Sequence, residues 1–322
     1  MSTTAPKIFI GGGTGFIGTV LRILFQNEGY NVKVISRTPV QGGVTWSDLT
    51  LMDLPENTAA VINCSGENVL NPKYRWNETF KKKVYSSRIS TNDFLVEMIK
   101  ETKYKPKVFI SMSGVGIYKP DPVKEYDEYT KINEGFDYIS KLAIDWEKST
   151  ELPEDTDVRR VIVRSGVVLG RTGGMIKQVF PQFYLGLGGP IGDGKQFFPW
   201  IHVYDLCRMM LYAVKNEKVT GVLNGVAPEI ITNNQFTKAF GKALWRPTIT
   251  PLPAFAVKLI FGQERSVMML EGQKVIPKRV QELGFDYIHP SIDSACTEFS
   301  KLFYIPPEWK GNFKQQVPEI SS

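Results

Sequence analysis

The fold is decided close to the start of the chain, by the stretch Ile8-Phe-Ile-Gly-Gly-Gly-Thr-Gly-Phe-Ile-Gly18. A short apolar run, 8–10, breaks into glycines, and an amphipathic stretch, 20–27, follows them. This order is typical of a strand, a tight turn and a helix. The glycines at positions 12, 15 and 18 are three residues apart, which is the spacing of the phosphate-binding turn in a dinucleotide site.

Each of the three spaced glycines has a separate task in such a site. One makes the turn off the strand, one lets the backbone approach a pyrophosphate, and one lets the helix pack close to the sheet. The N-terminus of the helix then offers free N–H groups and a partial positive charge to the phosphates. The alternative, an ordinary glycine-rich turn, is weakened by the strand and the helix on either side. The expected contacts of the dinucleotide here are Gly12, Thr14, Gly15, Phe16, Ile17 and Gly18.

The length and composition are those of a globular protein. With 322 residues, of which 42% are hydrophobic and 22% charged, the chain can form one large domain or two modest ones. It has no apolar run close to the ~20 residues that span a bilayer, so we expect no membrane partner. Residues 1–7 are too short and polar for a signal or transit peptide, so we expect the mature chain to begin here, in the cytoplasm.

Cysteine usage and net charge narrow the class of protein further. The three cysteines, Cys64, Cys207 and Cys296, are far apart and form no CxxC pair, which indicates free thiols in a reducing compartment and no metal site. The net charge of +6 suits an anionic cofactor or substrate. The densest basic run, 81–83, has the pattern of a solvated helix face, so we expect no nucleic-acid partner.

Strand-like and helix-like segments alternate through the first half of the chain. The candidate strands are 7–10, 31–36, 59–63, 108–113 and 160–169, and the candidate helices are 15–27, 77–101 and 133–151. The strands are continuous apolar runs, as expected where helices cover both faces of a parallel sheet. We therefore predict an α/β fold of the Rossmann-like, doubly wound class, with a parallel sheet and a smaller mixed C-terminal substrate domain.

The character of the sequence changes after residue 169. Residues 170–202 are rich in glycine and aromatics, while 203–215 and 221–226 have the patterns of a helix and a strand that could return to the sheet. Residues 227–300 are mostly helical with proline breaks, and the last residues are polar. We expect a dinucleotide-binding domain of residues 1–169 plus 203–226, a substrate domain of 170–202 plus 227–304, and a C-terminal tail of 305–322.

The end of the second candidate strand indicates which nucleotide would bind. NAD sites usually place an Asp or Glu at this point, where it binds the ribose 2′-hydroxyl. Here the strand ends in Ser36-Arg37-Thr38, and the next acid is Asp48. A guanidinium at Arg37 and a hydroxyl at Ser36 would bind a 2′-phosphate, which favours NADP(H) over NAD(H). The alternative is that Arg37 is an ordinary surface residue of a loop.

Other strand ends should also line the cofactor, because ligands of parallel sheets bind at the carboxyl ends of the strands. The third candidate strand ends in Cys64-Ser65-Gly66, and these small residues would let a dinucleotide pass. On the following helix, Arg88 is the better placed cation if that helix crosses the cofactor, whereas Lys83 fits a solvent-exposed charge.

Four motifs follow one another along the chain: the glycine turn, Ser111-Met-Ser-Gly-Val-Gly-Ile-Tyr118, Arg164-Ser-Gly-Val-Val-Leu-Gly170 and Phe198-Pro-Trp-Ile-His-Val-Tyr-Asp205. In this order they resemble the extended short-chain dehydrogenases/reductases, the relatives of nucleotide-sugar epimerases and dehydratases. Further stretches resemble the atypical epimerase-family branch of NAD-dependent epimerase/dehydratase-like proteins: 65–68, 74–76, Trp146-Glu147, 186–192 and 270–274.

The resemblance covers about residues 7–300 and implies an NADP-dependent oxidoreductase with its own short C-terminal domain. It places Lys141 and Val168 at the cofactor. It also implies a catalytic Ser or Thr, a Tyr and a Lys, of which the Tyr exchanges a proton with the substrate. Only the lysine has a counterpart, Lys141, because Asp137 stands at the tyrosine position and Gly114 at the hydroxyl position.

Other groups could replace the missing relay. Tyr138 is one residue late, which turns it by ~100° around a helix. Tyr118 follows the fourth candidate strand, near the nicotinamide in the family, so it either acts as a catalyst together with Lys141 or packs in the core. Ser111, Ser113 and Glu67 are further candidates. His202 is one of only two histidines and a further candidate, but its place in the motif favours a structural or rim role.

The substrate side has fewer signals. The candidate substrate contacts are Glu67, Arg75, Phe198 and Trp200. The aromatics could form an apolar wall with Phe197, and Arg75 or Lys195 could bind an anion. The alternative is that these aromatics pack the two domains together.

Two functions from different classes stay open at this point. The first is an NADP(H)-dependent oxidoreductase or epimerase-like enzyme that acts on a small molecule without the usual Ser-Tyr-Lys relay. The second is a non-catalytic NADP(H)-binding sensor or scaffold protein, as transcriptional co-regulators of this fold illustrate.

Overall fold

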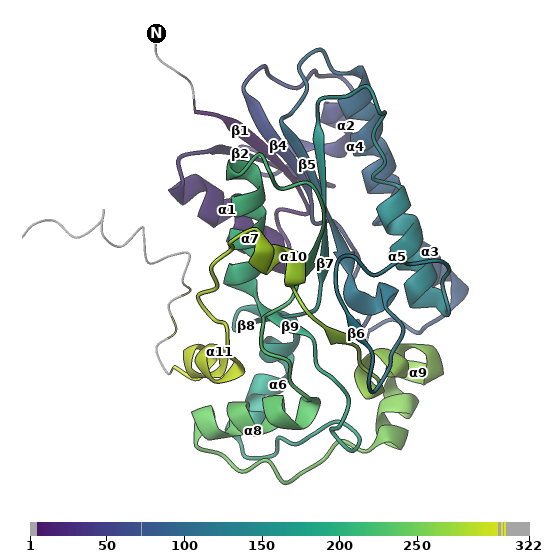
Figure 1. Cartoon of the computed structure of the whole chain (residues 1–322), viewed down its shortest axis with the longest axis vertical. Helices are drawn as coiled ribbons and strands as arrows, with labels where there is room; N and C mark the ends of the chain where they lie inside the picture. The colour runs from purple at the N-terminus through teal and green to yellow at the C-terminus, as the bar shows by residue number, and fades with distance from the viewer. Residues whose placement is uncertain (1–4, 72, 302–303, 305, 307–322) are drawn as a thin grey trace, which may run out of the picture.

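A seven-stranded parallel sheet forms the centre of the molecule (Figure 1). The computed structural model describes residues 5–71, 73–301, 304 and 306 of the chain. Across the sheet the strands follow the order β10-β7-β5-β4-β1-β2-β3, and every neighbouring pair is parallel. They span β1 (Lys7–Gly11), β2 (Asn31–Ser36), β3 (Val44–Thr45), β4 (Thr58–Asn63), β5 (Val108–Gly114), β7 (Arg159–Ser165) and β10 (Gly221–Gly225).

Helices cover both faces of the sheet, as the sequence predicts for a doubly wound fold (Figure 1). One face carries α1 (Phe16–Asn27) and α7 (Val203–Lys215), and the other carries α4 (Ile89–Glu101). Successive side chains of strand β1 point to opposite faces of the sheet, so the strand contributes to both cores. Ile8 and Ile10 lie in the core under α1 and α7, while Phe9 lies in the core under α4. This confirms the predicted Rossmann-like class.

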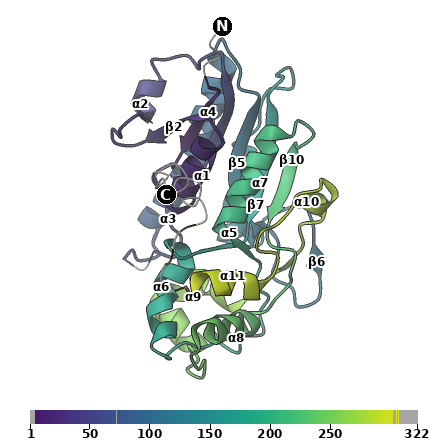
Figure 2. The same ribbon diagram turned by 90° about the vertical axis from the view of Figure 1, so that its left-hand side faces the viewer.

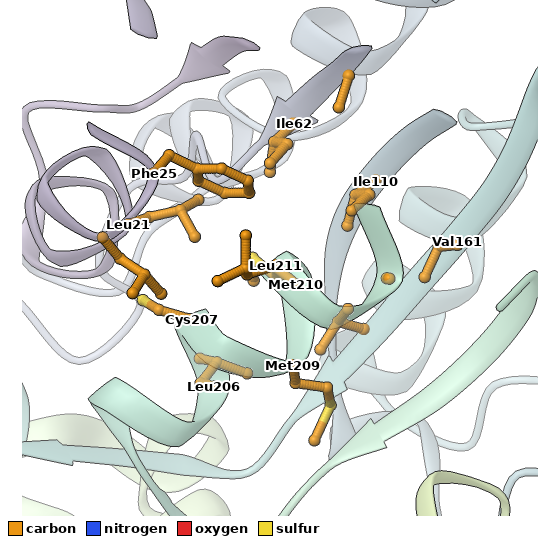
Figure 3. Packing of buried hydrophobic residues seen from close by; sticks show 14 of the residues in the cluster. Leu21, Phe25, Ile62, Ile110, Val161, Leu206, Cys207, Met209, Met210 and Leu211 are labelled. Atoms are coloured by element: carbon orange, nitrogen blue, oxygen red, sulfur yellow. The ribbon is translucent and has the colours of Figure 1, made fainter. Parts of the chain in front are cut away.

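The core under α1 and α7 holds much of the fold together (Figure 3). Leu21 and Phe25 of α1 meet Leu206 and Met210 of α7 over the central strands, and all four are buried. Full burial of one such side chain contributes about 1.5–3 kcal/mol to the stability. The helix pair therefore fixes the position of α1, and with α1 the position of the glycine turn that precedes it.

Much of the second half of the chain gathers beyond the carboxyl ends of the strands (Figure 2). The helices on that side are α6 (Gly174–Tyr184), α8 (Asn233–Leu244), α9 (Ala254–Leu270) and α11 (Ile292–Phe299). Two small parallel sheets join them, β8 (Val167–Gly170) with β9 (Trp200–His202) and β6 (Glu125–Tyr126) with β11 (Lys274–Val275). The other helices are α2 (Trp46–Leu49), α3 (Glu78–Ser86), η1 (Val115–Ile117), α5 (Tyr138–Lys148) and α10 (Lys278–Glu282).

A separate hydrophobic cluster fills the part built by α6, α8 and α11. It includes Phe183, Trp200, Phe236, Phe240 and Phe299. Because this cluster is distinct from the cores of the main sheet, we keep the division into 1–169 plus 203–226 and 170–202 plus 227–304 as a proposal. Most of the predicted tail, 305–322, lies outside the described residues.

The predicted strand 160–169 is two strands that belong to different sheets. β7 ends at Ser165 and β8 begins at Val167. Between them, a Cβ on Gly166 would lie 2.5 Å from the carbonyl oxygen of Pro199, so only glycine fits. The chain leaves the main sheet at Gly166 and continues beside β9.

The predicted helix 77–101 is also two helices, α3 and α4, which meet at Ser87 and Arg88. The Ser87 hydroxyl donates to the Val84 carbonyl at 2.9 Å, and the Thr91 hydroxyl donates to the Arg88 carbonyl at 2.9 Å. Hydroxyl side chains that bond to nearby backbone compete with the helical pattern, which explains a break that apolar periodicity does not show.

The predicted helix 133–151 begins only at Tyr138, because Asp137 caps it. The Asp137 carboxylate accepts a hydrogen bond from the Ser140 N–H at 2.7 Å, and the Ser140 hydroxyl oxygen accepts one from the Asp137 N–H at 2.9 Å. This reciprocal pair is a capping box. Asp137, which the resemblance places at the tyrosine position, thus lies before the helix and serves its N-terminus.

We expect Asp137→Ala to lower the free energy of unfolding by about 1 kcal/mol, because the cap is lost. Asp137→Asn keeps an acceptor oxygen and should lose much less. Urea unfolding of the two variants beside the parent protein measures the difference. Equal losses in both variants would contradict the capping role.

Candidate functional site

The glycine turn between β1 and α1 has the geometry of a phosphate-binding loop. Gly12 has a φ of 74°, and a Cβ there would lie 2.8 Å from the backbone of Cys64. A Cβ on Gly18 would lie 2.2 Å from the carbonyl oxygen of Gly12. These two glycines are required by the packing of the turn against β4 and of α1 against the turn.

Gly15 differs from its two neighbours in the motif. Its φ of −79° is open to any residue, and a Cβ there would meet only the Gly12 carbonyl oxygen, at 3.3 Å. The space beside Gly15 is therefore left free on the exposed side of the turn, where Thr14 is also exposed. At Gly15 the free space, and not the backbone angle, is therefore what favours glycine.

The N-terminus of α1 is a suitable place for an anion. Gly15 is its N-cap and offers no side chain, and the first turn holds no acidic residue. The free N–H groups and the helix dipole thus have no partner from the cap side chain or the first turn. Phe16 packs against the glycines that follow β8, and Ile17 is half buried. The residues present fit a pyrophosphate at this turn.

The end of β2 offers a cation without a competing acid. Arg37 is exposed and has no carboxylate partner among the residues that the structure describes. The buried hydroxyl of Ser36 donates to the Thr38 carbonyl, so it holds the turn after the strand. Asp48, the next acid in the sequence, is used in the capping box of α2. Arg37 is therefore free to bind a phosphate beyond β2.

The end of β4 is narrow, as expected for a strand that a dinucleotide crosses. The Asn63 side chain accepts a hydrogen bond from the Ser65 N–H at 3.0 Å and fixes the turn after the strand. Cys64 is half-buried, and desolvation raises the pKa of its thiol to about 12, so the thiol is inert. A Cβ on Gly66 would lie 3.1 Å from the guanidinium carbon of Arg88.

Arg88 is the cation that the fold brings to this strand end. Its guanidinium lies over the Trp146 ring at 4.9 Å and donates to the Val84 carbonyl at 3.1 Å. Burial lowers its pKa to about 10, and no carboxylate pairs with it within the described part of the chain. A half-buried cation without a counter-ion fits an anionic ligand that would lie across Gly66.

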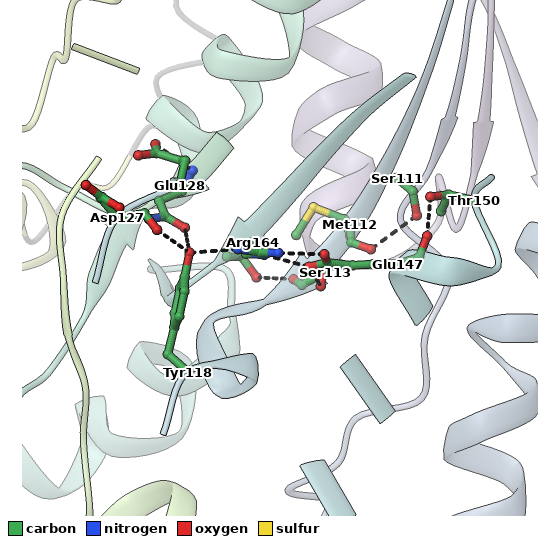
Figure 4. A network of polar contacts seen from close by, with 11 residues as sticks. Ser111, Met112, Ser113, Tyr118, Asp127, Glu128, Glu147, Thr150 and Arg164 are labelled. Carbon is green, nitrogen blue, oxygen red and sulfur yellow. Dashed lines mark hydrogen bonds and ion pairs between the residues drawn. The ribbon is translucent and has the colours of Figure 1, made fainter. Parts of the chain in front are cut away.

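Tyr118 belongs to a buried polar network rather than to an open site (Figure 4). Its side chain has no exposed surface, and its hydroxyl donates to Asn224 Oδ1 at 2.9 Å and accepts from Arg164 Nη1 at 2.9 Å. Burial raises the pKa of Tyr118, against the opposing effect of Arg164. A proton donor must reach its substrate, so this geometry favours the packing role over the catalytic role.

The same network includes the hydroxyl of Ser113, which was a second candidate to replace the missing relay. Arg164 forms a bidentate ion pair with Glu147 at 2.7 Å, and the Ser113 hydroxyl donates to Glu147 at 2.8 Å (Figure 4). Ser111 is likewise bonded to Asn92 at 3.2 Å. The family motifs at Trp146-Glu147 and Arg164 thus tie α5 to β5 and β7, a role that the motifs alone did not reveal.

Lys141 is the member of the expected relay that remains exposed. It lies in the first turns of α5, and no hydrogen bond or ion pair of its ammonium group is found within the described residues. Tyr138 is turned elsewhere, and its hydroxyl donates to the Lys81 carbonyl at 2.9 Å. Lys141 therefore stays a candidate for the ribose contact, and Tyr138 stabilises the contact between α5 and α3.

The candidate substrate residues separate into two groups. Glu67 pairs with Lys83 at 3.0 Å, and although burial alone would raise the pKa of Glu67, Lys83 holds it below its usual value. Arg75 is exposed. Phe198 and Trp200 are buried in the cluster around α8, so the structure favours the packing alternative for both.

A contact between α9 and the segment after β4 was not foreseen from the sequence. Glu264 accepts from the Trp76 indole at 2.7 Å and pairs with Lys81 at 2.9 Å. Arg265 donates to the carbonyls of Val69 and Asn71. Beside α9, a cavity of about 440 Å³ lies against the loop that contains Ile191, Asp193 and Gln196. In the sequence, only the motif 74–76 marked this region. The spacing of residues cannot reveal that Trp76 contacts Glu264, which is 188 residues away in the chain.

His202 lies in a buried group with His289 and Glu298, which resembles a metal-ligand set. The Tyr204 N–H donates to His202 Nδ1 at 3.1 Å, so the proton of His202 is on Nε2, which donates to Glu298 at 2.7 Å. A metal at Nε2 would need that proton removed and the cap of α7 broken. His202 is therefore a helix cap, in line with the structural role considered for it.

The geometry defines a class of protein: a doubly wound α/β nucleotide-binding protein whose glycine turn, strand ends and arginines surround one site. Residues 8–224 match the NAD dependent epimerase/dehydratase family, and residues 252–299 match a domain of unknown function, DUF1731. The chain belongs to the NAD dependent epimerase/dehydratase family. This confirms the resemblance found in the sequence.

Known relatives agree with this assignment. The epimerase family protein SDR39U1 of Mus musculus is 48% identical over 293 residues, which cover 91% of this chain and 99% of the relative. The Arabidopsis thaliana homologue, named chloroplastic, is 33% identical and covers 89% of this chain, with 85% of its own length matched. None of the described helices is long and apolar enough to cross a membrane.

Solved structures are similar as well. The crystal structure of human epimerase family protein SDR39U1 (isoform 2) with NADPH has a TM-score of 0.89 and 45% identity, and the match covers 92% of this chain and 100% of that one. The UDP-N-acetylglucosamine 4-epimerase of Bacillus cereus has a TM-score of 0.71 at 16% identity, covers 92% and 98% of the two chains, and shares the fold.

Burial and the neighbouring His202 lower the pKa of His289 from 6.5 to about 4, with Asp205 and Glu298 raising it and Lys301 lowering it. The folded protein thus keeps His289 neutral where the unfolded chain binds a proton. We expect this contribution to stability to be complete above pH 6.5 and to be lost as the pH falls toward 4. As the pH is lowered from 6.5 to 4, the thermal unfolding midpoint of the parent protein should fall more than that of His289→Phe. Parallel pH profiles would contradict the assignment.

Proposed function

We propose that the protein is an NADP(H)-dependent oxidoreductase or epimerase-like enzyme that acts on a small molecule without the Ser-Tyr-Lys relay. Two observations together carry the proposal: the N-terminus of α1 has no side-chain cap, and Arg37 at the end of β2 has no carboxylate partner among the residues that the structure describes. The first fits a pyrophosphate and the second fits a 2′-phosphate. The human relative crystallised with NADPH supports the same cofactor.

The residues proposed to bind the cofactor follow the carboxyl edge of the sheet. They are Gly12, Thr14, Gly15, Phe16, Ile17, Gly18, Ser36, Arg37, Cys64, Ser65, Gly66, Arg88, Lys141 and Val168. Gly12 and Gly18 shape the turn, Arg37 and Arg88 supply positive charge, and Lys141 is the candidate for the ribose. A bound nicotinamide would supply hydride chemistry at this edge. We place the protein in the cytoplasm as part of the proposal.

The alternative is a non-catalytic NADP(H)-binding sensor or scaffold. One observation favours it: Tyr118 and Ser113 are both engaged in the buried network, and Asp137 caps α5, so no hydroxyl of the expected relay is free. The Glu67–Lys83 pair is the remaining titratable candidate near the end of β4.

Two measurements on one sample separate these functions. NADPH binding is followed by calorimetry, and its oxidation is followed by absorbance with a panel of carbonyl compounds and nucleotide sugars. Turnover that Glu67→Gln slows supports the enzyme. Tight NADPH binding without turnover on any member of the panel supports the sensor, and no binding to either nucleotide contradicts both.

NADPH should bind more tightly than NADH, because Arg37 can pair with the 2′-phosphate. A charge-assisted hydrogen bond contributes about 1.5–3 kcal/mol, so the preference should be at least ~10-fold. Arg37→Ala should remove most of it and leave the NADH affinity unchanged. Titration calorimetry with both nucleotides measures this, and equal affinities in the parent protein would refute the proposed role of Arg37.

Gly15→Val should abolish NADPH binding while the protein stays folded, because the added side chain points into the free space of the turn. Gly18→Val is the matched control: its Cβ would strike the Gly12 carbonyl oxygen at 2.2 Å, so it should destabilise the fold itself. For both variants, thermal unfolding measures the stability and titration calorimetry measures the NADPH affinity. A folded Gly15→Val protein that retains its NADPH affinity would show that the cofactor does not lie at this turn.

A further inference from the structure

Exposed apolar side chains are concentrated at the end of the molecule opposite β1. Eight large hydrophobic side chains of the described chain are at least 60% exposed, and six of them lie in two short segments, 184–187 and 245–260. These six are Leu185, Leu187, Trp245, Ile249, Phe255 and Leu259. Monomeric proteins rarely gather so much apolar surface in one place without a partner. We call these six residues and the cations beside them the distal surface.

The two segments are neighbours in space, so the six exposed side chains lie on adjacent parts of the molecule. Arg246 Nε donates to the Tyr184 carbonyl at 2.7 Å, and the Leu252 N–H donates to the Pro190 carbonyl at 2.8 Å. The loop from α8 to α9 therefore runs beside the chain that follows α6. Phe255 and Leu259 continue the surface along one side of α9, since residues four apart share a helix face.

The charges around these side chains have a single sign. Residues 171–192 and 230–263 contain no Asp or Glu, in a chain with 33 acidic residues. Within them Lys177, Lys238, Lys242, Arg246 and Lys258 are all exposed, and none forms an ion pair with any described residue. Five cations without an ion pair among the described residues thus lie on α6, α8, α9 and the loop before α9, the part of the chain that carries or adjoins the apolar side chains.

Trp245 is the C-cap of α8, and its N–H donates to the Lys242 carbonyl at 3.1 Å. It is the one residue other than glycine, within the described chain, with a positive φ, 56°, and it is 89% exposed. A left-handed backbone is unfavourable for such a residue. The cap explains the backbone conformation, but it does not use the indole, which is left exposed next to Arg246.

We propose that the distal surface docks on the surface of an anionic lipid bilayer. Trp, Phe, Leu and Ile side chains can enter the headgroup region, while lysines and arginines bind the anionic headgroups. A second copy meeting through the same surface would set five cations against five, which disfavours self-association. The sequence prediction of no membrane partner rested on the lack of a spanning run, which has no bearing on peripheral binding.

The test uses the full chain and sedimentation with vesicles of phosphatidylcholine, with and without phosphatidylserine. We expect binding only to the vesicles with phosphatidylserine, and weaker binding at high salt, because salt screens the charges. Lys238→Ala together with Lys242→Ala should weaken binding roughly thirty-fold. Leu259→Glu should abolish it, and the Trp245 fluorescence change expected on binding should be lost with it.

Leu51→Glu is the matched control, because Leu51 is 88% exposed and lies in a different part of the molecule. Its vesicle binding should equal that of the parent, and all variants should retain the parent's thermal unfolding midpoint. The proposal is overturned by absence of binding to phosphatidylserine vesicles or by equal losses in Leu51→Glu and Leu259→Glu. A dimer that Leu259→Glu dissociates, or binding to polyglutamate but not to vesicles, would overturn it in favour of a protein partner.

Discussion

The close approach of α1 to the turn before it is the constraint on which the rest of the structure depends. Gly18 lies so near the Gly12 carbonyl that a single methyl group would not fit. This approach sets the helix N-terminus at the edge of β1, between β2 and β4, which is where the strand order changes direction. The helix α7 then packs on α1, and β8 and β9 are positioned by α7. A small displacement of α1 would therefore move both the phosphate-binding turn and the second half of the chain.

Strong local patterns made most of the main sheet predictable. The glycine turn, the apolar strands and the helix that begins at Val203 appear in the sequence as periodic segments with clear ends, and the structure has them at nearly the same bounds. The failures were at Gly166, Ser87 and Asp137, where one residue ends an element whose hydrophobic pattern continues. In each case the cause is a specific contact, such as the Pro199 carbonyl beside Gly166, that no periodicity contains.

The candidate site was predictable where it depends on local sequence and not where it depends on distant contacts. Arg37 could be placed because it directly follows a strand. Arg88 could be proposed as a cation, but its position over Trp146 and under Gly66 joins three separate segments. Tyr118 could be assigned either role from the sequence, and the structure favours the packing role by supplying Asn224 and Arg164 as its partners. The motif residues Glu147 and Arg164 tell as much about this region as the missing tyrosine does. Their hydrogen bonds show that polar groups here hold α5, β5 and β7 together.

The chain passes more than once between the main sheet and the cluster around α8, and this has a consequence for proteolysis and unfolding. After β7 the chain leaves the main sheet for β8, α6 and β9, returns for α7 and β10, and leaves again for α8 and α9. A single cut between α6 and β9, or between β10 and α8, would therefore release neither the main sheet nor the cluster around α8, since each is completed by segments on both sides of the cut. Proteolysis there should leave nicked molecules that stay associated, and the main sheet and the cluster around α8 should unfold as one cooperative unit.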